Sequence, residues 1–390
     1  MNIDKFTSRV SGKLVETIYD DKSCLAFVPH LLPPLLSMDD RELSLTLSNA
    51  DRALGELAGL GHNIPNPQLL IRSFVRREAV LSSKIEGTQT GIVDLYAYEA
   101  GQLPLPGINP SPPEADRLEV LNYVRALEYG FQQLETTGVD LDLIMNIHKV
   151  LMKGSAGAYK RPGEFRATQN WIGSTNIRSA IFVPPLPAEM KEALTDLDRY
   201  LKAPHDYPPL LRLAFIHYQF ESIHPFIDGN GRTGRLLIVI LLVHWGLLPL
   251  PLLYLSAFFE RRRDDYFNHL LAVTENGMWL DWVLFFLRGV EEQAKDAIQR
   301  AKRLQGLQIE WHRRLVDIKV STAVLDLADK LFEMPFVSIS DAKKLLGISS
   351  YNTARRAVAK LVGARILQPF GDEGYGRLFA ATEILDLLKE

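Results

Sequence analysis

The segment 224–235, with the sequence HPFIDGNGRTGR, concentrates groups that bind phosphate. Its middle, from Gly229 to Gly231, can turn successive backbone N–H groups toward one point and so form an anion-binding nest. A helix is expected to begin there, and the positive end of its dipole would face the same point. Arg232 and Arg235 are three residues apart and share one face of that helix. Together these groups predict a site for a polyphosphate.

Two further side chains of this segment could act on a bound polyphosphate. Asp228 is a carboxylate among cationic groups, and its natural use is to hold a divalent metal, Mg²⁺, that bridges phosphate oxygens. His224 follows an apolar helix expected over residues 208–223. A histidine at this point can take a proton from an attacking hydroxyl at neutral pH. The pattern therefore predicts nucleotidyl or phosphoryl transfer from a nucleoside triphosphate.

The segment also resembles the signature of Fic domains, His-x-Phe-x-Asp/Glu-Gly-Asn-Gly-Arg-x-x-Arg, at every defined position. The usual activity of that family is AMPylation, which transfers AMP from ATP to a protein hydroxyl and releases pyrophosphate. The resemblance implies that His224 is the general base and Asp228 the Mg²⁺ ligand. It also implies that Asn230 and the amides of Gly229 and Gly231 hold the α-phosphate.

The remaining positions of the signature receive roles in the same way. The resemblance implies that Arg232 and Arg235 bind the β- and γ-phosphates. Phe226 is expected to anchor the loop in the hydrophobic core. ATP is thus the expected substrate, although the sequence does not separate ATP from other triphosphates.

An upstream segment, SSKIEGTQT at residues 82–90, suggests a partner for these arginines. Ser82 and Glu86 are four residues apart on a helix expected over 67–86, where the dipole disfavours a carboxylate at the C-terminal end. The pattern Ser-x-x-x-Glu-Gly resembles the inhibitory motif of Fic proteins that carry their own brake. That likeness implies that Glu86 pairs with Arg235 and keeps the γ-phosphate from its productive place. Some family members use this glutamate to remove AMP, and that alternative stays open.

Residues 169–184 are expected to form a short β-hairpin, because strand-forming residues lie on both sides of a Gly-Ser turn. The hairpin resembles the flap of Fic proteins, which docks a target segment by strand addition. Its flanks, GEFR at 163–166 and FVPP at 182–185, are similar to those of the flap. The partner implied is a target protein, whose identity the sequence does not reveal.

The adenine pocket is expected to use residues 255–270, with Tyr266 as the best single candidate. Arg261 to Arg263, in the same stretch, favour solvated charges over ligands. The base-binding side of the site is therefore predicted far less sharply than the phosphate side.

Most of the chain is expected to be helical, which favours a helical bundle carrying one hairpin. The expected helices cover residues 39–61, 67–86, 114–135, 140–153, 188–203, 208–223, 230–247, 262–276 and 278–305. The prolines of segment 27–36 suggest an extended strap across another surface. Segment 101–117, rich in proline and glycine, is the clearest loop.

The tail has another pattern, with helices expected over 321–333, 338–346 and 350–362 and two short strands within 365–382. This order is typical of a winged helix-turn-helix domain. Basic residues and no acidic ones occupy 342–365, namely Lys343, Lys344, Arg355, Arg356, Lys360 and Arg365. The strip is compatible with DNA phosphates, and equally with protein contact or dimerisation.

The predicted fold class is mainly α: a Fic-type helical bundle with a β-hairpin flap, followed by a C-terminal winged helix-turn-helix domain. The predicted units are a helical region with the inhibitory helix at 1–105, a Fic catalytic core at 106–305 and the winged helix at 315–390. A homodimer is expected by analogy with the family.

Composition is that of an ordinary soluble protein, with 47% hydrophobic residues and a net charge of −3 over 390 residues. This balance excludes a globally basic nucleic-acid-binding protein. The single cysteine, Cys24, excludes an internal disulfide and fits a reducing compartment. The hydrophobic segment 236–255 is broken by Pro249 and Pro251, which leaves too short a helix for a bilayer. A cytoplasmic protein with no membrane segment is expected.

Three functions follow from these patterns. The first is an autoinhibited protein adenylyltransferase that modifies a target and itself. The second is a hydrolase that removes AMP at the same site. The third is a DNA-binding regulator whose Fic core responds to nucleotide without modifying a protein.

Overall fold

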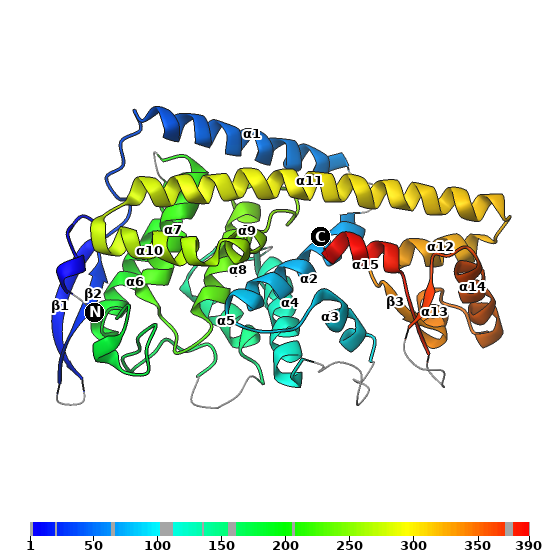
Figure 1. Ribbon diagram of the computed structural model, residues 1–390, viewed down its shortest axis with the longest axis horizontal. Coiled ribbons are helices and arrows are strands. Elements are labelled where there is room, and N and C mark those ends of the chain that lie inside the picture. The colour runs from blue at the N-terminus through cyan, green and yellow to red at the C-terminus, as the bar shows by residue number, and fades with distance from the viewer. Residues whose placement is uncertain are drawn as a thin grey trace.

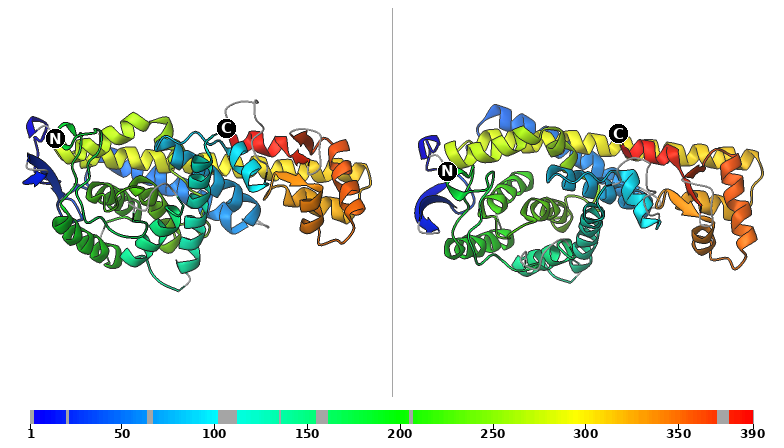
Figure 2. Two further views of the ribbon diagram at one scale, coloured as in Figure 1. Left: turned by 90° about the horizontal axis from the view of Figure 1, so that it is seen from below. Right: turned by 60° about the horizontal axis from the view of Figure 1, so that its bottom comes forward.

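The computed structural model describes residues 3–19, 22–63, 67–101, 112–134, 136–154, 161–204, 207–370 and 377–389. Most of the loop predicted at 101–117 lies outside these ranges. The molecule is elongated, with the N-terminal strands at one end and the C-terminal elements at the other (Figure 1). The long helix α11 runs along one side from end to end, as both further views confirm (Figure 2).

Helices dominate the described residues, as the sequence predicts. They are η1 (Ile3–Lys5), α1 (Arg41–Asn63), α2 (Pro67–Ile85), α3 (Ile92–Glu99), α4 (Glu114–Leu134), α5 (Leu141–Leu151), η3 (Ile177–Ser179), α6 (Pro187–Lys202), α7 (Pro209–Ile223), α8 (Asn230–His244), α9 (Ser256–Arg261), α10 (Arg263–Asn276), α11 (Trp279–Asp317), α12 (Thr322–Lys330), α13 (Ile339–Leu345), α14 (Tyr351–Gly363) and α15 (Thr382–Lys389). The strands are β1 (Gly12–Tyr19), β2 (Lys22–Pro29), β3 (Phe336–Ser338), β4 (Gln368–Phe370) and β5 (Leu378–Ala380). Each helix predicted from 39 to 305 is confirmed, whereas α3 and α9 were not predicted.

Helix α2 begins and ends as its sequence predicts. Pro67 occupies the first turn, and Gly87, just beyond the helix, has a φ of 105°. Arg263 donates from Nε to the carbonyl of Ile85 at 2.9 Å, which satisfies one of the last helical carbonyls. Arg263 is therefore more than the solvated charge predicted for it, and it helps to end the helix.

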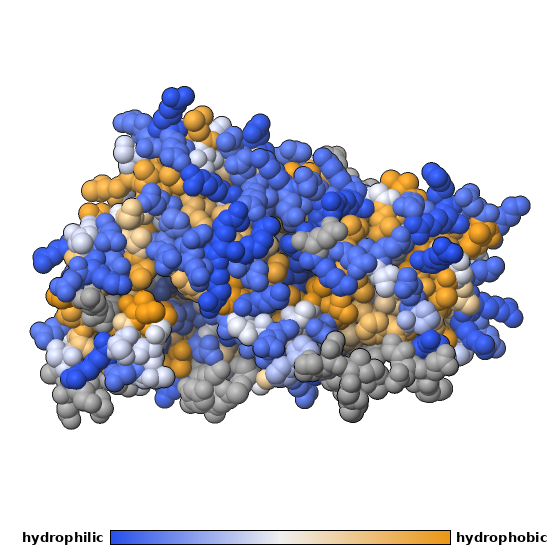
Figure 3. All heavy atoms as spheres, in the orientation of Figure 1, coloured by the Kyte–Doolittle hydropathy of each residue, from blue (hydrophilic) through white to orange (hydrophobic). Residues whose placement is uncertain are grey.

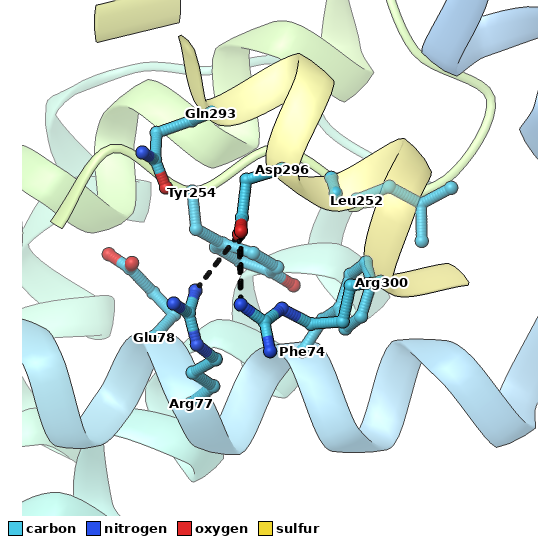
Figure 4. Close-up of a pocket in the computed structure, with 9 residues that line it drawn as sticks. Phe74, Arg77, Glu78, Leu252, Tyr254, Gln293, Asp296 and Arg300 are labelled. Carbon is cyan, nitrogen blue, oxygen red and sulfur yellow. Dashed lines mark hydrogen bonds and ion pairs between the residues drawn. The ribbon is translucent and has the colours of Figure 1, made fainter. Parts of the chain in front are cut away.

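Polar contacts from the C-terminal half of the chain hold α2 along its length. Ser73 donates from Oγ to the carbonyl of Phe332 at 3.0 Å, and this bond is buried. On α11, the carboxylate of Asp296 lies 3.5 Å from Arg77 of α2 and 3.0 Å from Arg300 (Figure 4). The cavity beside these groups has about 20 Å³, a volume that suits one water molecule. The position of α2 is therefore set by both α11 and the tail.

Replacing Asp296 by asparagine is expected to lower the free energy of unfolding by about 1.5 kcal/mol, because two arginines share its carboxylate. Arg300 is only 6% exposed and would lose its charged partner. Denaturant unfolding followed by circular dichroism measures the loss. The matched control is Asp196→Asn, whose partner Arg199 is 67% exposed, so that at most about 1 kcal/mol is expected. Equal losses in the two variants would contradict the interpretation.

Helices α7 and α8 form the hydrophobic centre of the molecule. Their apolar residues are buried on almost every side, which explains why both helices lack a polar face. Helix α8 ends at His244, three residues before its predicted end at 247, and so stops before Pro249 as expected. Within the described ranges, no helix is both long enough and apolar enough to span a bilayer.

The first strands were not predicted. β1 and β2 pair antiparallel, with Gly12 opposite Pro29. β2 takes the beginning of the predicted strap at 27–36, and the rest of the strap lies against α7 and its N-terminal loop. There, the carbonyl of His30 accepts a hydrogen bond from Gln219 at 2.9 Å, and that of Pro34 accepts one from Tyr207 at 3.2 Å.

The short β-hairpin predicted at 169–184 is present only in minimal form, without regular strands. Between Ile172 and Phe182 there is one isolated antiparallel bridge, and η3 occupies the far turn. The turn is held locally, because Trp171 donates to the carbonyl of Ser174 at 3.0 Å. Further pairing comes from outside the segment: Phe27 of β2 donates to the carbonyl of Val183 at 2.9 Å. We keep the term flap for residues 169–184.

The tail contains the three predicted helices as α12, α13 and α14. Its strands form an antiparallel sheet in the order β3-β5-β4, so that β3 is an addition to the two predicted strands. Helix α15 was also not predicted. The winged-helix assignment stays a prediction. One hydrophobic cluster runs from Leu43 to Leu388 through all three predicted units, whose bounds therefore also stay predictions.

The outer surface is mixed in character. On the face of Figure 3, hydrophobic side chains are scattered among hydrophilic ones. The basic side chains predicted on α14 are on the surface, since Arg355, Arg356 and Lys360 are exposed. This is the surface that DNA contact would require.

Candidate active site

The loop between α7 and α8 carries the predicted phosphate-binding segment. His224 ends α7 with φ 49° and ψ 60°, a left-handed conformation that costs energy for a residue with a side chain. Gly229 also has a positive φ, 79°, and α8 begins at the next residue. The backbone around the nest therefore has the conformations that its glycines predict, and His224 is held in place by its surroundings.

Asn230 and Phe226 close this loop on itself. Asn230 accepts from the backbone N–H of Phe226 through Oδ1 and donates to its carbonyl through Nδ2, both at 2.8 Å. Phe226 is fully buried, as predicted for a core anchor. The side chain of Asn230 is thus occupied in shaping the loop. The second N–H of this amide and the backbone N–H of Asn230 have no part in these two bonds, so the predicted phosphate contact stays a prediction.

His148 of α5 also supports the loop, and sequence reasoning missed it. Its ring stacks on Phe226 at 3.6 Å between centroids and 6° between planes. Nε2 donates to the carbonyl of Asp228 at 2.9 Å, while Nδ1 accepts from the N–H of Gly163 at 2.9 Å. Burial lowers the pKa of His148 to about 4, so the ring is neutral and both bonds fix one tautomer.

Replacing His148 by phenylalanine is expected to keep the ring stack but lose both hydrogen bonds. Because the site is buried, the free energy of unfolding should fall by about 2 kcal/mol. Chemical denaturation measures this change. His62→Phe, at an exposed position on α1, is the matched control. A loss no larger than that of the control would show that the bonds to Asp228 and Gly163 contribute nothing.

The predicted ion pair between Glu86 and Arg235 is present. Arg235 of α8 donates from Nη2 to Glu86 at 2.7 Å, and from Nε and Nη2 to the hydroxyl and carbonyl of Ser82 at 2.8 and 3.0 Å. Burial is the largest single influence and would raise the pKa of Glu86. The charge of Arg235, its hydrogen bond and the charge of Arg232 together outweigh burial and lower that pKa below its usual 4.5. The carboxylate is therefore ionised at neutral pH.

The carboxylate of Glu86 also lies against the nest itself. A Cβ atom at Gly231 would collide with Glu86 Oε1, so the close approach depends on glycine at this position. Gly231 is in the first turn of α8, where unpaired N–H groups and the helix dipole attract anions. In this structure the carboxylate of Glu86 thus occupies the place where a phosphate group is predicted to bind.

Arg232 has a carboxylate partner that was not predicted. It pairs with Glu119 of α4 and lies 3.5 Å from Asp228, and its side chain is 4% exposed. Both arginines of the segment are thus neutralised by acidic residues from earlier helices. A triphosphate would have to replace or join these partners.

Asp228 is the only residue predicted to bind a metal ion, and the surroundings of its carboxylate can be compared with what Mg²⁺ requires. Its carboxylate is 38% exposed and accepts from the N–H of Gly229 at 2.6 Å. No cluster of three or more potential ligand side chains exists among the described residues. A single accessible carboxylate fits Mg²⁺, which commonly binds one or two carboxylates together with phosphate oxygens and water. The donor set therefore fits this ion.

The imidazole of His224 is poised to accept a proton. Burial, followed by the nearby charge of Arg166, lowers the pKa of His224 to about 4. The ring is therefore neutral at pH 7, which is the form that a general base requires. The residue as a whole is partly exposed, while Nδ1 of its ring is buried and has no hydrogen-bond partner among the described residues.

Tyr266 does not line an open pocket, which corrects its prediction as an adenine contact. It is 1% exposed, its hydroxyl lies 2.8 Å from Nε2 of His217, and its ring stacks on Phe259 at 4.4 Å. Its aromatic neighbours make it a core residue. The described residues give no replacement candidate for the adenine pocket.

The flap is attached directly to this loop. Asn170 donates from Nδ2 to the carbonyl of Phe226 at 2.9 Å. Farther out, Ile172 and Ile181 are 39% and 56% exposed. The flap thus presents apolar side chains to the outside while its base touches the segment that contains His224.

Two family profiles match the chain. Residues 45–132 match the Fic/DOC family N-terminal region, and residues 138–242 match the Fic/DOC family. The first range contains Ser82 and Glu86, and the second contains the whole segment 224–235. The two halves of the site thus lie in the two matched regions.

Curated relatives share this similarity. The chain is 26% identical over 301 residues to a protein adenylyltransferase Fic of Nematostella vectensis, covering 76% of this chain and 65% of that protein. It is 34% identical over 163 residues to one of Drosophila persimilis, covering 40% of this chain and 28% of that protein. The chain therefore spans less than two thirds of the length of either relative.

Solved structures agree on the fold. A Fic family protein from Desulfovibrio desulfuricans G20 has a TM-score of 0.57 at 20% identity, covering 90% of this chain and 98% of that one. Fic-1 from C. elegans has a TM-score of 0.51 at 20% identity, covering 67% and 74%.

Proposed function

Because the chain belongs to the Fic/DOC family, we propose that it is a protein adenylyltransferase that transfers AMP from ATP to a hydroxyl of a target protein and of itself. The observation that carries the proposal is the loop that joins the neutral imidazole of His224 to an anion nest at the start of α8. A base beside a polyphosphate site is what hydroxyl attack on a phosphate requires.

The protein groups have separate tasks in this mechanism. The N–H groups of Asn230 and Gly231 and the two arginines would bind the triphosphate with its α-phosphate near His224, and that of Gly229, bonded here to Asp228, would have to be released to join them. His224 would accept the proton of the target hydroxyl as its oxygen attacks, and pyrophosphate would leave. Asp228 would hold Mg²⁺, which supplies neutralisation of phosphate charge when bound.

We further propose that Glu86 inhibits this reaction. Its carboxylate occupies Arg235 and lies over Gly231, so a γ-phosphate and Glu86 would compete for the same cationic groups. In-line attack needs precise placement of the α-phosphate, and a displaced triphosphate would react slowly. The state described here would then be the inhibited one.

Further proposals concern the partners of the protein and its location. The flap would dock an extended segment of the target by strand addition, next to its exposed isoleucines. A homodimer and a cytoplasmic location are proposals that rest on family analogy and on the single cysteine. The exposed basic side chains of α14 support one further candidate, a DNA-binding regulator that responds to nucleotide.

Incubation with Mg²⁺ and ATP labelled at the α-phosphate tests the proposed function. Label that becomes attached to protein supports adenylyl transfer. Release of labelled AMP from pre-modified protein would indicate the hydrolase instead. A nucleotide-dependent shift of DNA in a gel, without labelled protein, would indicate the regulator.

A further inference from the structure

Arg166 is a buried arginine without a carboxylate beside it. Its exposure is 1%, and in the parts of the chain described here it forms no ion pair. Burial lowers the pKa of Arg166 to about 10, so the guanidinium is still charged at neutral pH. A buried charge is costly unless its donors are satisfied, and the partners of this one are therefore informative.

The donors of Arg166 go to carbonyl groups of three separate segments. Nε donates to His224 at 2.9 Å, Nη1 donates to Thr168 at 3.2 Å, and Nη2 donates to Pro185. Thr168 immediately precedes the flap, and Pro185 immediately follows it. The backbone N–H of Arg166 adds a bond to the carbonyl of Pro225 at 2.9 Å. One planar side chain thus joins both ends of the flap to the residue that ends α7.

We propose that Arg166 is a positioning residue for the transfer reaction, because it keeps the base of the flap at a fixed place relative to His224. The inference rests on the proposed function, in which the flap docks the target and His224 receives the proton of its hydroxyl. A misplacement of about 1 Å can cost roughly 10²-fold in rate. Lysine keeps the charge but lacks the planar, forked donors that reach three carbonyls at once.

The charge of Arg166 has a second effect, on the protonation of His224. Burial is the largest influence that lowers the pKa of His224, and the charge of Arg166 is the second. A hydrogen bond to the backbone of Glu221 and the charges of Glu86 and Asp228 raise this pKa. Loss of the charge of Arg166 should move the pKa of His224 from about 4 toward its ordinary value. A merely structural contact would not have this effect.

The first test measures transfer in a Glu86→Gly background, with labelled ATP and Mg²⁺. Adding Arg166→Lys should lower self-labelling at least about tenfold, while the Kd for ATP stays within about twofold. Hydrolysis of ATP to AMP should fall less, because water does not dock on the flap. Arg161→Lys, at a side chain that is 57% exposed, is the matched control. Undiminished self-labelling, or an equal loss of ATP affinity, would overturn the proposal.

The second test does not depend on activity. Proton NMR follows the titration of the His224 ring, assigned with His224→Ala, in wild type, Arg166→Lys and Arg166→Met. The pKa should rise in the methionine variant and stay low in the lysine variant; an unchanged value in the methionine variant would overturn the proposal. If the Glu86→Gly parent forms neither labelled protein nor AMP, the proposed function fails, and this titration still decides whether Arg166 acts on His224.

Discussion

Replacement of His224 by alanine is expected to lower AMP transfer by about 10²- to 10⁴-fold, the usual contribution of a general base. The histidine ends α7 in a strained left-handed conformation, and its carbonyl accepts a hydrogen bond from Arg166. Its lowered pKa keeps the ring neutral, so nearly every molecule has a base ready at pH 7. Alanine removes the proton acceptor and leaves the nest intact.

The measurement is the initial rate of labelling with ATP labelled at the α-phosphate, in a Glu86→Gly background where the rate is highest. The Kd for ATP should be nearly unchanged in the His224→Ala variant, which separates a lost base from a lost site. His62→Ala, exposed on α1, serves as the control. A variant that retains a third or more of the parent rate would exclude His224 as the base.

Replacement of Glu86 by glycine is expected to raise self-labelling by about 5- to 150-fold, the range of typical coupling energies between sites. The change removes the carboxylate that occupies Arg235 and covers Gly231, and frees both for a γ-phosphate. It also leaves the nearly buried Arg235 without its charged partner. The variant should therefore unfold more easily than wild type when no nucleotide is present.

Three further variants are compared with Glu86→Gly, and the first of them separates the charge of Glu86 from its shape. Glu86→Gln keeps the side chain but loses its charge, and should be activated less than Glu86→Gly. Ser82→Ala removes one bond to Arg235 and should have the smallest effect. Glu42→Gly breaks an exposed ion pair with Arg288 and controls for the loss of a surface carboxylate. Equal labelling by Glu86→Gly and wild type would exclude inhibition by this residue.

Local patterns explain what could be predicted of the site. The loop conformations follow from the order of residues in 224–235, and the end of α2 follows from Gly87. The pairing of Glu86 with Arg235 was found because two short motifs implied it together. By contrast, nothing local distinguishes Glu119, one of 47 acidic residues, as the partner of Arg232. Only the packing of α4 against α8 brings these two together.

The errors have physical causes as well. The phosphate contact predicted for Asn230 stays a prediction, and the sequence does not indicate that its amide also bonds to both polar groups of the Phe226 backbone. Tyr266 is predicted as an adenine contact, but its ring stacks on Phe259 and its hydroxyl lies near His217 in a stretch that packs inward. The flap lacks regular strands because its backbone bonds within the turn and with β2. The β-branched residues Val15 and Thr17, near Asp20 and Asp21, could have indicated the first hairpin.

The continuity of α11 bears on how the tail is placed relative to the site around His224. Its 39 residues form one helix of about 58 Å. The tail is bonded to the C-terminal half of this helix through Glu383, which accepts hydrogen bonds from Trp311 and Arg314. Among the described residues, only 318–321 separate α11 from α12, so a macromolecule held on α14 would be presented to His224 at a nearly constant distance. This distance would select among partners. A partner whose acceptor hydroxyl lies too near to its α14 contact, or too far from it, would bind without being modified.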